Sequence, residues 1–261
     1  MANGKSFGLL SGNALKIIAA ITMLIDHMGV VLFPRAEILR IIGRISFPIF
    51  AYMIAEGCHY TKNKLKYFLS VFILGAGCQA VYSLYGGGKL LGILIAFSIS
   101  IPIIYAMQFM KKAFLVKAPI AIQISATLIF ILSILACYAL NEKLLIDYGF
   151  FGCMAPVFAS AFKVPREIQK TNPNEPSEIN SAPKIPFDIA QLLNVISLGL
   201  CLVALIFTMS ALQAYALLSL PLLLLYSGKR GKLKMKYFFY VFYPLHLAAL
   251  ESISYLLKML K

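Results

Sequence analysis

The most regular feature of the chain is the alternation of long apolar runs with short polar connections. At about 1.5 Å per residue, a helix of roughly 20 residues crosses the hydrocarbon layer of a membrane, and most of the runs reach that length. The predicted spans are Ala14–Phe33, Ile38–Cys58, Leu65–Tyr85, Leu90–Met110, Ala118–Leu140, Tyr148–Phe162, Asp188–Thr208, Leu212–Ser227 and Tyr237–Leu257. The pattern therefore predicts an all-α, polytopic integral membrane bundle with about nine transmembrane helices, eight and ten being the alternatives.

Two features of the runs modify this picture. The sixth and eighth runs are short, and the sixth also fits a tilted, re-entrant or interfacial helix. Pro48, Pro102 and Pro244 lie inside predicted spans, where prolines kink or end helices. The longest polar stretch, residues 163–187, is too short and too rich in Pro, Asn and Ser to build its own core. We therefore expect one transmembrane domain over residues 1–261, with this stretch as a cytoplasmic loop.

Composition and charge support a membrane protein and give its orientation. Apolar residues make up 61% of the chain and charged residues 13%, against about half and about a quarter in soluble domains. Of the 24 Lys and Arg residues, 16 fall in the loops on the side of the N-terminus, 5 on the other side and 3 within spans. The positive-inside rule then predicts a cytoplasmic N-terminus. It also accounts for the net charge of +14 without nucleic acid as a partner.

The five cysteines all lie in apolar runs and have no metal-binding spacing. We interpret them as small core residues, and the sequence predicts no metal site.

The stretch "TMLIDHMGVV" at residues 22–31 places Asp26 and His27 inside the first apolar run. Ionisable groups at this depth cost several kcal/mol, and they usually face the bundle interior with a partner. By the rise of a helix, Asp26 lies about 18 Å and Arg44 roughly 21 Å from the cytoplasmic face, on neighbouring spans. His246 in the last span lies within about 6 Å of that level. The four residues are therefore expected to share one layer.

Helix geometry separates the neighbouring pair Asp26 and His27. Adjacent residues on a helix point about 100° apart, so both side chains cannot face Arg44. We expect Asp26 to pair with Arg44 and His27 to turn toward a cavity that it shares with His246. An alternative is that the Asp–Arg pair only holds two helices in register. A single buried histidine is likewise often a packing residue, although two at one depth favour a functional site.

With these residues in hand, the chain resembles the TraX family, multi-pass proteins linked to N-terminal acetylation of conjugative F-pilin. The matching stretches are "LKIIAAITMLIDHMGVVLF", "RIIGRISFPIFAYMIAEGCHYTKN", "DYGFFG" and "KYFFYVFYPLHLAAL". The family in turn is similar to transmembrane acyltransferases such as heparan-alpha-glucosaminide N-acetyltransferase. The family residues carried over to this chain are Asp26, His27, Gly43, Arg44, Pro48, Glu56, Gly57, His59, Asp147, Tyr148, Gly149, Tyr243, Pro244 and His246.

The resemblance implies an enzyme of the bacterial cytoplasmic (inner) membrane that moves an acetyl group from cytosolic acetyl-CoA. The acceptor is an amine, such as a pilin-like N-terminus, or a hydroxyl. We expect His27 to be the base, Asp26 to fix its orientation or charge, and Arg44 to be a partner or oxyanion aid. His246 is the second candidate for the base, or a donor to the thioester carbonyl.

The phosphates of coenzyme A should lie near the basic cytoplasmic loops. The run "GKRGKLKMK" at residues 228–236 is mostly explained by the positive-inside rule, but it also suits a polyanionic ligand or lipid headgroups. We assign the donor to Glu56, His59, Lys229, Arg230 and Lys232. The pantetheine arm would then need a channel of roughly 15–20 Å to reach the Asp–His layer.

Two other classes of function use the same residues. A proton-coupled transporter or flippase would also carry Asp, His and Arg at mid-depth. A polytopic scaffold in a pilus assembly complex would need neither histidine.

Overall fold

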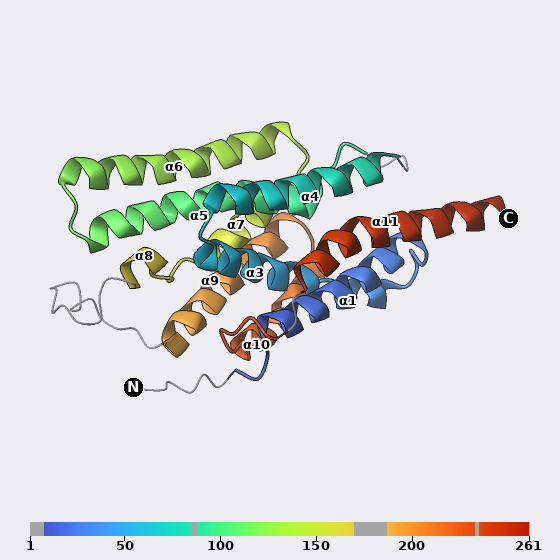
Figure 1. Cartoon of the computed structure of the whole chain (residues 1–261). Coiled ribbons are helices and arrows are strands. Elements are labelled where there is room, and N and C mark those ends of the chain that lie inside the picture. Colours follow the sequence, from blue (N-terminus) through green and yellow to red (C-terminus); the bar gives the residue numbers. More distant parts are fainter. Residues whose placement is uncertain (1–7, 85–87, 170–186, 233–234, 261) are drawn as a thin grey trace.

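Helices form almost all the regular structure (Figure 1). The computed structural model describes residues 8–84, 88–169, 187–232 and 235–260 of the 261-residue chain. The elements are α1 (Gly12–Val31), α2 (Glu37–Gly43), α3 (Ser46–Tyr60), α4 (Lys64–Leu84), α5 (Ile93–Leu115), α6 (Ile120–Lys143), α7 (Gly149–Phe158), α8 (Arg166–Gln169), α9 (Phe187–Thr208), the 3-10 helix η2 (Ala211–Leu218), α10 (Ser219–Leu224) and α11 (Lys236–Met259). The all-α prediction is confirmed for the described residues.

Six of the nine predicted spans are long and apolar enough to cross a membrane. They are α1, the combined α2–α3 segment (Glu37–Tyr60), α4, α5, α6 and Ile189–Thr208 of α9. α4 and α6 bury little of their surface in the bundle, whereas the α2–α3 pair is mostly buried. Apolar side chains that face outward from a helix of this length suit contact with lipid. The chain is therefore a polytopic membrane protein, with six clear candidate spans among the described residues.

The sixth predicted span forms only the ten-residue helix α7, which at about 1.5 Å per residue is too short to cross a membrane. The segment around it nevertheless runs the length of α5. Ile146 pairs with Leu91 just before α5, and Lys111 near the end of α5 donates hydrogen bonds to the carbonyl oxygens of Ser160 and Ala161. This segment therefore passes through the bundle as a short helix that is preceded by a bridge and a turn at residues 146–148 and followed by turns at residues 159–162.

The eighth and ninth predicted spans also depart from a plain apolar helix. The eighth consists of η2 followed by α10, together Ala211–Leu224. It returns along α9, because Gln191 near the start of α9 donates hydrogen bonds to the carbonyl oxygens of Leu223 and Tyr226. The ninth, α11, has 24 residues, but its polar residues, among them His246 and Glu251, leave it outside the six apolar spans. The sixth and eighth segments are therefore short, as the sequence predicts, and the count of nine crossings stays a prediction beyond the six apolar spans.

The second predicted span is broken at Arg44 and Ile45, between α2 and α3. Pro48 explains the break, because it lacks the backbone N–H that would bond to the carbonyl of Arg44 in a continuous helix. It is instead the third residue of α3, a position in the first turn where that N–H has no helical partner. By contrast, Pro102 and Pro244 remain within α5 and α11.

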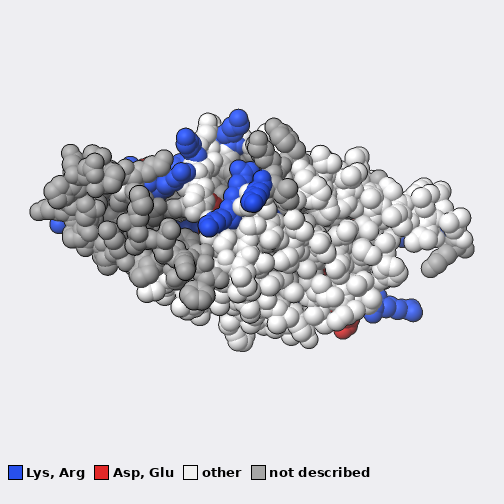
Figure 2. Space-filling view, turned by 60° about the horizontal axis from the view of Figure 1, so that its bottom comes forward, with Lys and Arg blue, Asp and Glu red and all other residues white. Residues whose placement is uncertain are grey.

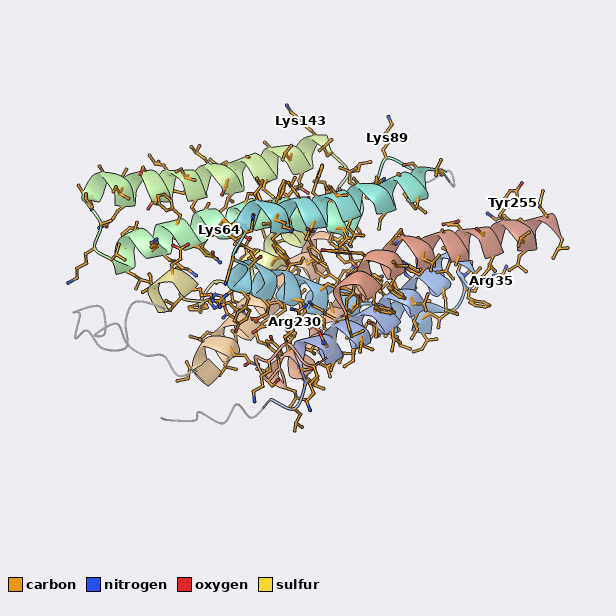
Figure 3. The ribbon with its side chains drawn as sticks, viewed as in Figure 1. Arg35, Lys64, Lys89, Lys143, Arg230 and Tyr255 are labelled. Atoms are coloured by element: carbon orange, nitrogen blue, oxygen red, sulfur yellow. The ribbon has the colours of Figure 1, made fainter. Side chains whose placement is uncertain are left out.

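The helices are arranged around α3 (Figure 1). α6 packs on α5, and α5 packs on α4 and α7; α1 lies against α2, α3 and α11, and α4 also contacts α11. Arg35, Lys89 and Lys143 point away from the helices, whereas Lys64 and Arg230 lie over the body of the bundle (Figure 3). Of the predicted cytoplasmic loop 163–187, residues 163–169 include α8, and residues 170–186 lie outside the described part of the chain.

Two glycines let α1 and α2 approach closely. A Cβ atom added to Gly29 of α1 would lie 2.9 Å from Cβ of Leu39. One added to Gly43 of α2 would lie 2.2 Å from Cβ of Asp26. Small residues allow such close contact between membrane helices. The hairpin of α1 and α2 therefore depends on having no side chain at these two positions.

We expect Gly43→Ala to destabilise the protein, because the new methyl group would overlap Asp26 close to its backbone. Overpacking of this kind costs about 1–3 kcal/mol. The control is Gly77→Ala in α4, where an added Cβ meets no atom within 4 Å. Thermal unfolding of the purified protein in detergent should show a lower midpoint for the first variant only. Equal midpoints for the two variants would contradict this account of the α1–α2 contact.

Candidate active site

A buried ion pair joins α1 to the end of α2, as predicted. Nη2 of Arg44 lies 2.5 Å from Oδ1 of Asp26, and Arg44 is only 4% exposed. Nη1 of Arg40, one turn earlier, lies 3.6 Å from the other oxygen of Asp26. Sequence reasoning missed Arg40, although its position four residues before Arg44 places both arginines on one face of α2. Two cations therefore hold the Asp26 carboxylate.

Arg44 also binds the segment that leads into α7. Its Nη1 donates to the hydroxyl oxygen of Tyr148 over 2.9 Å, and the Tyr148 ring stacks on Phe47 with centroids 4.2 Å apart. Tyr148 and Gly149 both have positive φ angles, 59° and 58°. A left-handed conformation is rare for a residue as large as tyrosine. The motif "DYGFFG" therefore marks a constrained turn that delivers Tyr148 to Arg44.

Asp147 lies beside the same arginine. Burial raises the pKa of its carboxyl to about 6, although the nearby Arg44 opposes this shift. From the sequence, Asp147 is expected at the outer start of the sixth span, at the interface, where an ionised group is easily solvated. The structure instead places it, partly buried, at the edge of the Arg44 cluster.

His27 and His246 form the second part of the layer, again as expected from the sequence. Nδ1 of His27 lies 2.8 Å from Nε2 of His246, and the two rings are nearly parallel with centroids 5.0 Å apart. Phe242 also stacks on His246, with ring centroids 4.9 Å apart. The bond between α1 and α11 thus joins residues 219 positions apart.

The hydrogen bonds define where the protons lie in the neutral pair. Nδ1 of His246 is 2.7 Å from the carbonyl oxygen of Phe242, which can only accept, so this nitrogen carries the proton. Nε2 of His246 is then an acceptor, and Nδ1 of His27 must donate to it. Nε2 of His27 keeps its lone pair and makes no hydrogen bond within the described part of the chain. His27 is also the more exposed of the two residues.

A cavity of about 750 Å³ opens beside this layer. Five basic side chains line it. They are Lys16 near the start of α1, Lys62 just after α3, Lys66 near the start of α4, Arg166 in α8 and Arg230 before α11. Figure 2 shows a cluster of Lys and Arg side chains around a hollow on one face of the molecule. The described surface next to this cluster has few charged residues. Deeper residues, such as Leu74, Phe97 and Phe239, are apolar. The cavity thus joins a basic entrance to an apolar interior.

The cavity ends short of the histidines. Its lining includes Phe50 and Tyr243, whose rings are 5.5 Å apart, but neither His27 nor His246. Phe239, Tyr243 and His246 are all buried and lie on one face of α11. The cavity therefore reaches to within about one helical turn of His246, and Phe50 and Tyr243 form part of its wall.

The residues that we assigned to the donor have different surroundings. Arg230 and Glu56 line the cavity, but the Glu56 carboxylate forms an ion pair with Lys163 and accepts a hydrogen bond from the hydroxyl of Tyr226. His59 lines a neighbouring pocket instead. Neither Lys229 nor Lys232 is among the described lining residues of either space. Sequence reasoning missed Lys16, Lys62, Lys66 and Arg166, which come from separate parts of the chain.

Comparison with known proteins identifies the family. The family described as "TraX protein" matches residues 11–171 and 187–254. A "Probable fimbrial assembly protein FimC, serogroup H1" from Dichelobacter nodosus is 25% identical over 258 residues, covering 94% of this chain and 96% of its own. An uncharacterized protein of Rickettsia prowazekii (strain Madrid E) is 42% identical over 60 residues, 23% of this chain and 24% of its own. No solved structure matches the chain.

The family match includes Asp26, His27, Arg44 and His246, the four residues of the layer, and extends over most of the sequence. The chain therefore belongs to the TraX family.

Proposed function

We propose that this protein is a membrane-embedded acyltransferase that moves an acetyl group from acetyl-CoA to an amine or hydroxyl. The observation that carries the proposal is the His27–His246 hydrogen bond, which leaves Nε2 of His27 as an unprotonated nitrogen. A neutral imidazole with a free lone pair suits proton abstraction near neutral pH. Membership of the TraX family, whose members are linked to pilin acetylation, supports the same reaction.

The volume and charge of the cavity beside the histidines support acetyl-CoA as its ligand. Its volume of about 750 Å³ falls in the range of pockets that enclose a small organic ligand. Coenzyme A has a diphosphate and a 3′-phosphate at one end, which the five basic side chains at the entrance would bind. Its narrow pantetheine arm would occupy the apolar interior. The thioester would reach the histidines once Phe50 and Tyr243, whose rings are 5.5 Å apart, move apart.

In the reaction, an amine that is protonated in solution first releases one proton to water. The lone pair of the neutral amine or hydroxyl then attacks the thioester carbonyl carbon while Nε2 of His27 takes the N–H or O–H proton of the attacking atom. A C–N or C–O bond forms and the C–S bond breaks. The departing thiolate takes the proton back from His27, so the products are the acetylated acceptor and free coenzyme A. His246 is a positioning residue, because its bond to Phe242 fixes which nitrogen of His27 is free.

Arg44 is better suited to positioning than to oxyanion stabilisation. Three of its five N–H groups already donate, to Asp26, Tyr148 and the carbonyl oxygen of Arg40. Asp26 in turn is held by Arg40 and Arg44. We therefore assign this cluster to holding α1 in the rotation that directs His27 at His246.

The acceptor that we favour is the N-terminal amine of a pilin-like subunit. The similarity to a protein named for fimbrial assembly supports an acceptor that builds surface fibres. An N-terminal amine has a pKa near 8, so it is mostly protonated at neutral pH and needs a base. The excess of Lys and Arg at the cavity entrance supports a cytoplasmic N-terminus in the bacterial inner membrane, with donor entry from the cytosol.

We predict that His27→Ala lowers acetyl transfer about 10²–10⁴-fold, the usual contribution of a general base. His246→Ala should cause a smaller loss, and His246→Gln should retain more activity because its amide oxygen can still accept from His27. The assay follows labelled acetyl from acetyl-CoA to a peptide with a free N-terminus, in detergent.

A non-catalytic transporter would give another pattern. It would show no acetyl transfer in detergent and would need sealed vesicles for any activity. Full activity of a folded His27→Ala variant would contradict His27 as the base, and unfolding midpoints check that the variants are folded.

We also predict that Lys66→Ala and Arg230→Ala each raise KM for acetyl-CoA about tenfold, because each removes a charged contact to a phosphate. The same variants should leave KM for acetyl-pantetheine, which lacks the phosphates, unchanged. The matched control is the exposed Lys89→Ala, which should alter neither value. An equal effect on both donors would show that these two residues do not contact the phosphates.

A further inference from the structure

A second pocket, of about 370 Å³, lies at the basic end of the bundle. It is formed by the end of α3, the start of α4, the end of α5, the start of α6 and α8. None of the Asp–His layer residues lines it, and its contents are not needed for acetyl transfer as proposed above. We therefore considered separately what it could bind.

The polar side of this pocket is strongly basic. Lys62, Lys64, Lys112 and Arg166 line it, and Glu167 is its one acidic residue. The two oxygens of Glu167 are shared between Lys64, at 3.4 Å, and Lys112, at 2.5 Å. These contacts lower the pKa of Glu167, so the carboxylate stays ionised. One carboxylate cannot neutralise four cations, and the pocket retains a positive charge that favours an anion.

The other side of the pocket is apolar and faces outward. Phe109, Val116 and Ile122 line it and are 44%, 40% and 42% exposed. They belong to the ends of α5 and α6 where these helices meet, and α6 presents most of its surface to the surroundings. Apolar side chains next to lysines at the end of a membrane helix mark the level where acyl chains give way to headgroups.

We propose that this pocket binds the phosphate of an anionic phospholipid from the membrane leaflet at the basic end of the bundle. The acyl chains of the lipid would lie against Phe109, Val116 and Ile122. Basic pockets between membrane helices on the cytoplasmic side are suited to anionic headgroups. The phosphate would lie between Lys64 and Lys112 and compete with Glu167 for them. Arg166, Lys62 and Thr61 line both this pocket and the larger cavity, so the bound lipid would also hold one wall of that cavity.

The test titrates delipidated full-length protein in detergent with dioleoyl phosphatidylglycerol or dioleoyl phosphatidylcholine and follows the unfolding midpoint. We expect phosphatidylglycerol to raise the midpoint more than phosphatidylcholine does. Lys64→Ala combined with Lys112→Ala should weaken this response, by about fivefold in affinity for each lysine. The control that combines Lys89→Ala with Lys143→Ala, both exposed and outside the pocket, should respond as the natural protein does.

A variant of opposite sign keeps the test decisive if the double lysine variant does not fold. Glu167→Gln removes the competing carboxylate and should lower the amount of phosphatidylglycerol needed for half of the response. A third titration adds glycerol 3-phosphate, the soluble fragment of the headgroup, and follows the same unfolding midpoint. The proposal is overturned if glycerol 3-phosphate gives the same rise as the lipid, if both lipids act equally, or if Glu167→Gln weakens the response.

Discussion

The ion pair between Asp26 and Arg44 sets the geometry of the rest of the site. A charged guanidinium that is almost fully buried is unfavourable unless its donors are paired, and here Asp26, Tyr148 and a backbone carbonyl pair with it. The pair fixes the rotation of α1 against α2. Since His27 follows Asp26 at about 100° around the helix, fixing Asp26 toward α2 turns His27 toward α11. Gly43, where no side chain fits, is a condition for this contact.

The site combines two environments that remain separate in this conformation. The basic entrance and apolar interior of the large cavity suit an amphiphilic polyanion, while the histidine pair lies just beyond Tyr243 and Phe50. Tyr243 and His246 occupy the same buried face of α11, so Tyr243 lies between the cavity and the histidine pair. For the proposed transfer, aromatic rings at this position would limit the access of water to the thioester.

Much of the site could be predicted from the sequence because it depends on regular geometry. The rise of a helix and the thickness of a membrane placed Asp26, Arg44 and His246 at one level, and the angle between neighbours separated Asp26 from His27. Tyr148 could not be found this way, since its contact depends on a turn with positive φ before α7. The pairing of Glu56 with Lys163 joins distant segments and leaves no local pattern. Hydropathy showed that the sixth and eighth runs are short, but it could not show that the eighth begins with a 3-10 helix.

The most direct test of the account is a structure with a non-reacting acetyl-CoA analogue bound. The account predicts phosphates at Arg230 and Lys66, the pantetheine arm between Phe50 and Tyr243, and the acetyl carbonyl close enough to His27 for an acceptor to bridge them. The bridging atom should lie at hydrogen-bond distance, about 2.6–3.2 Å, from Nε2 of His27. A thioester bound far from both His27 and His246 would contradict the mechanism.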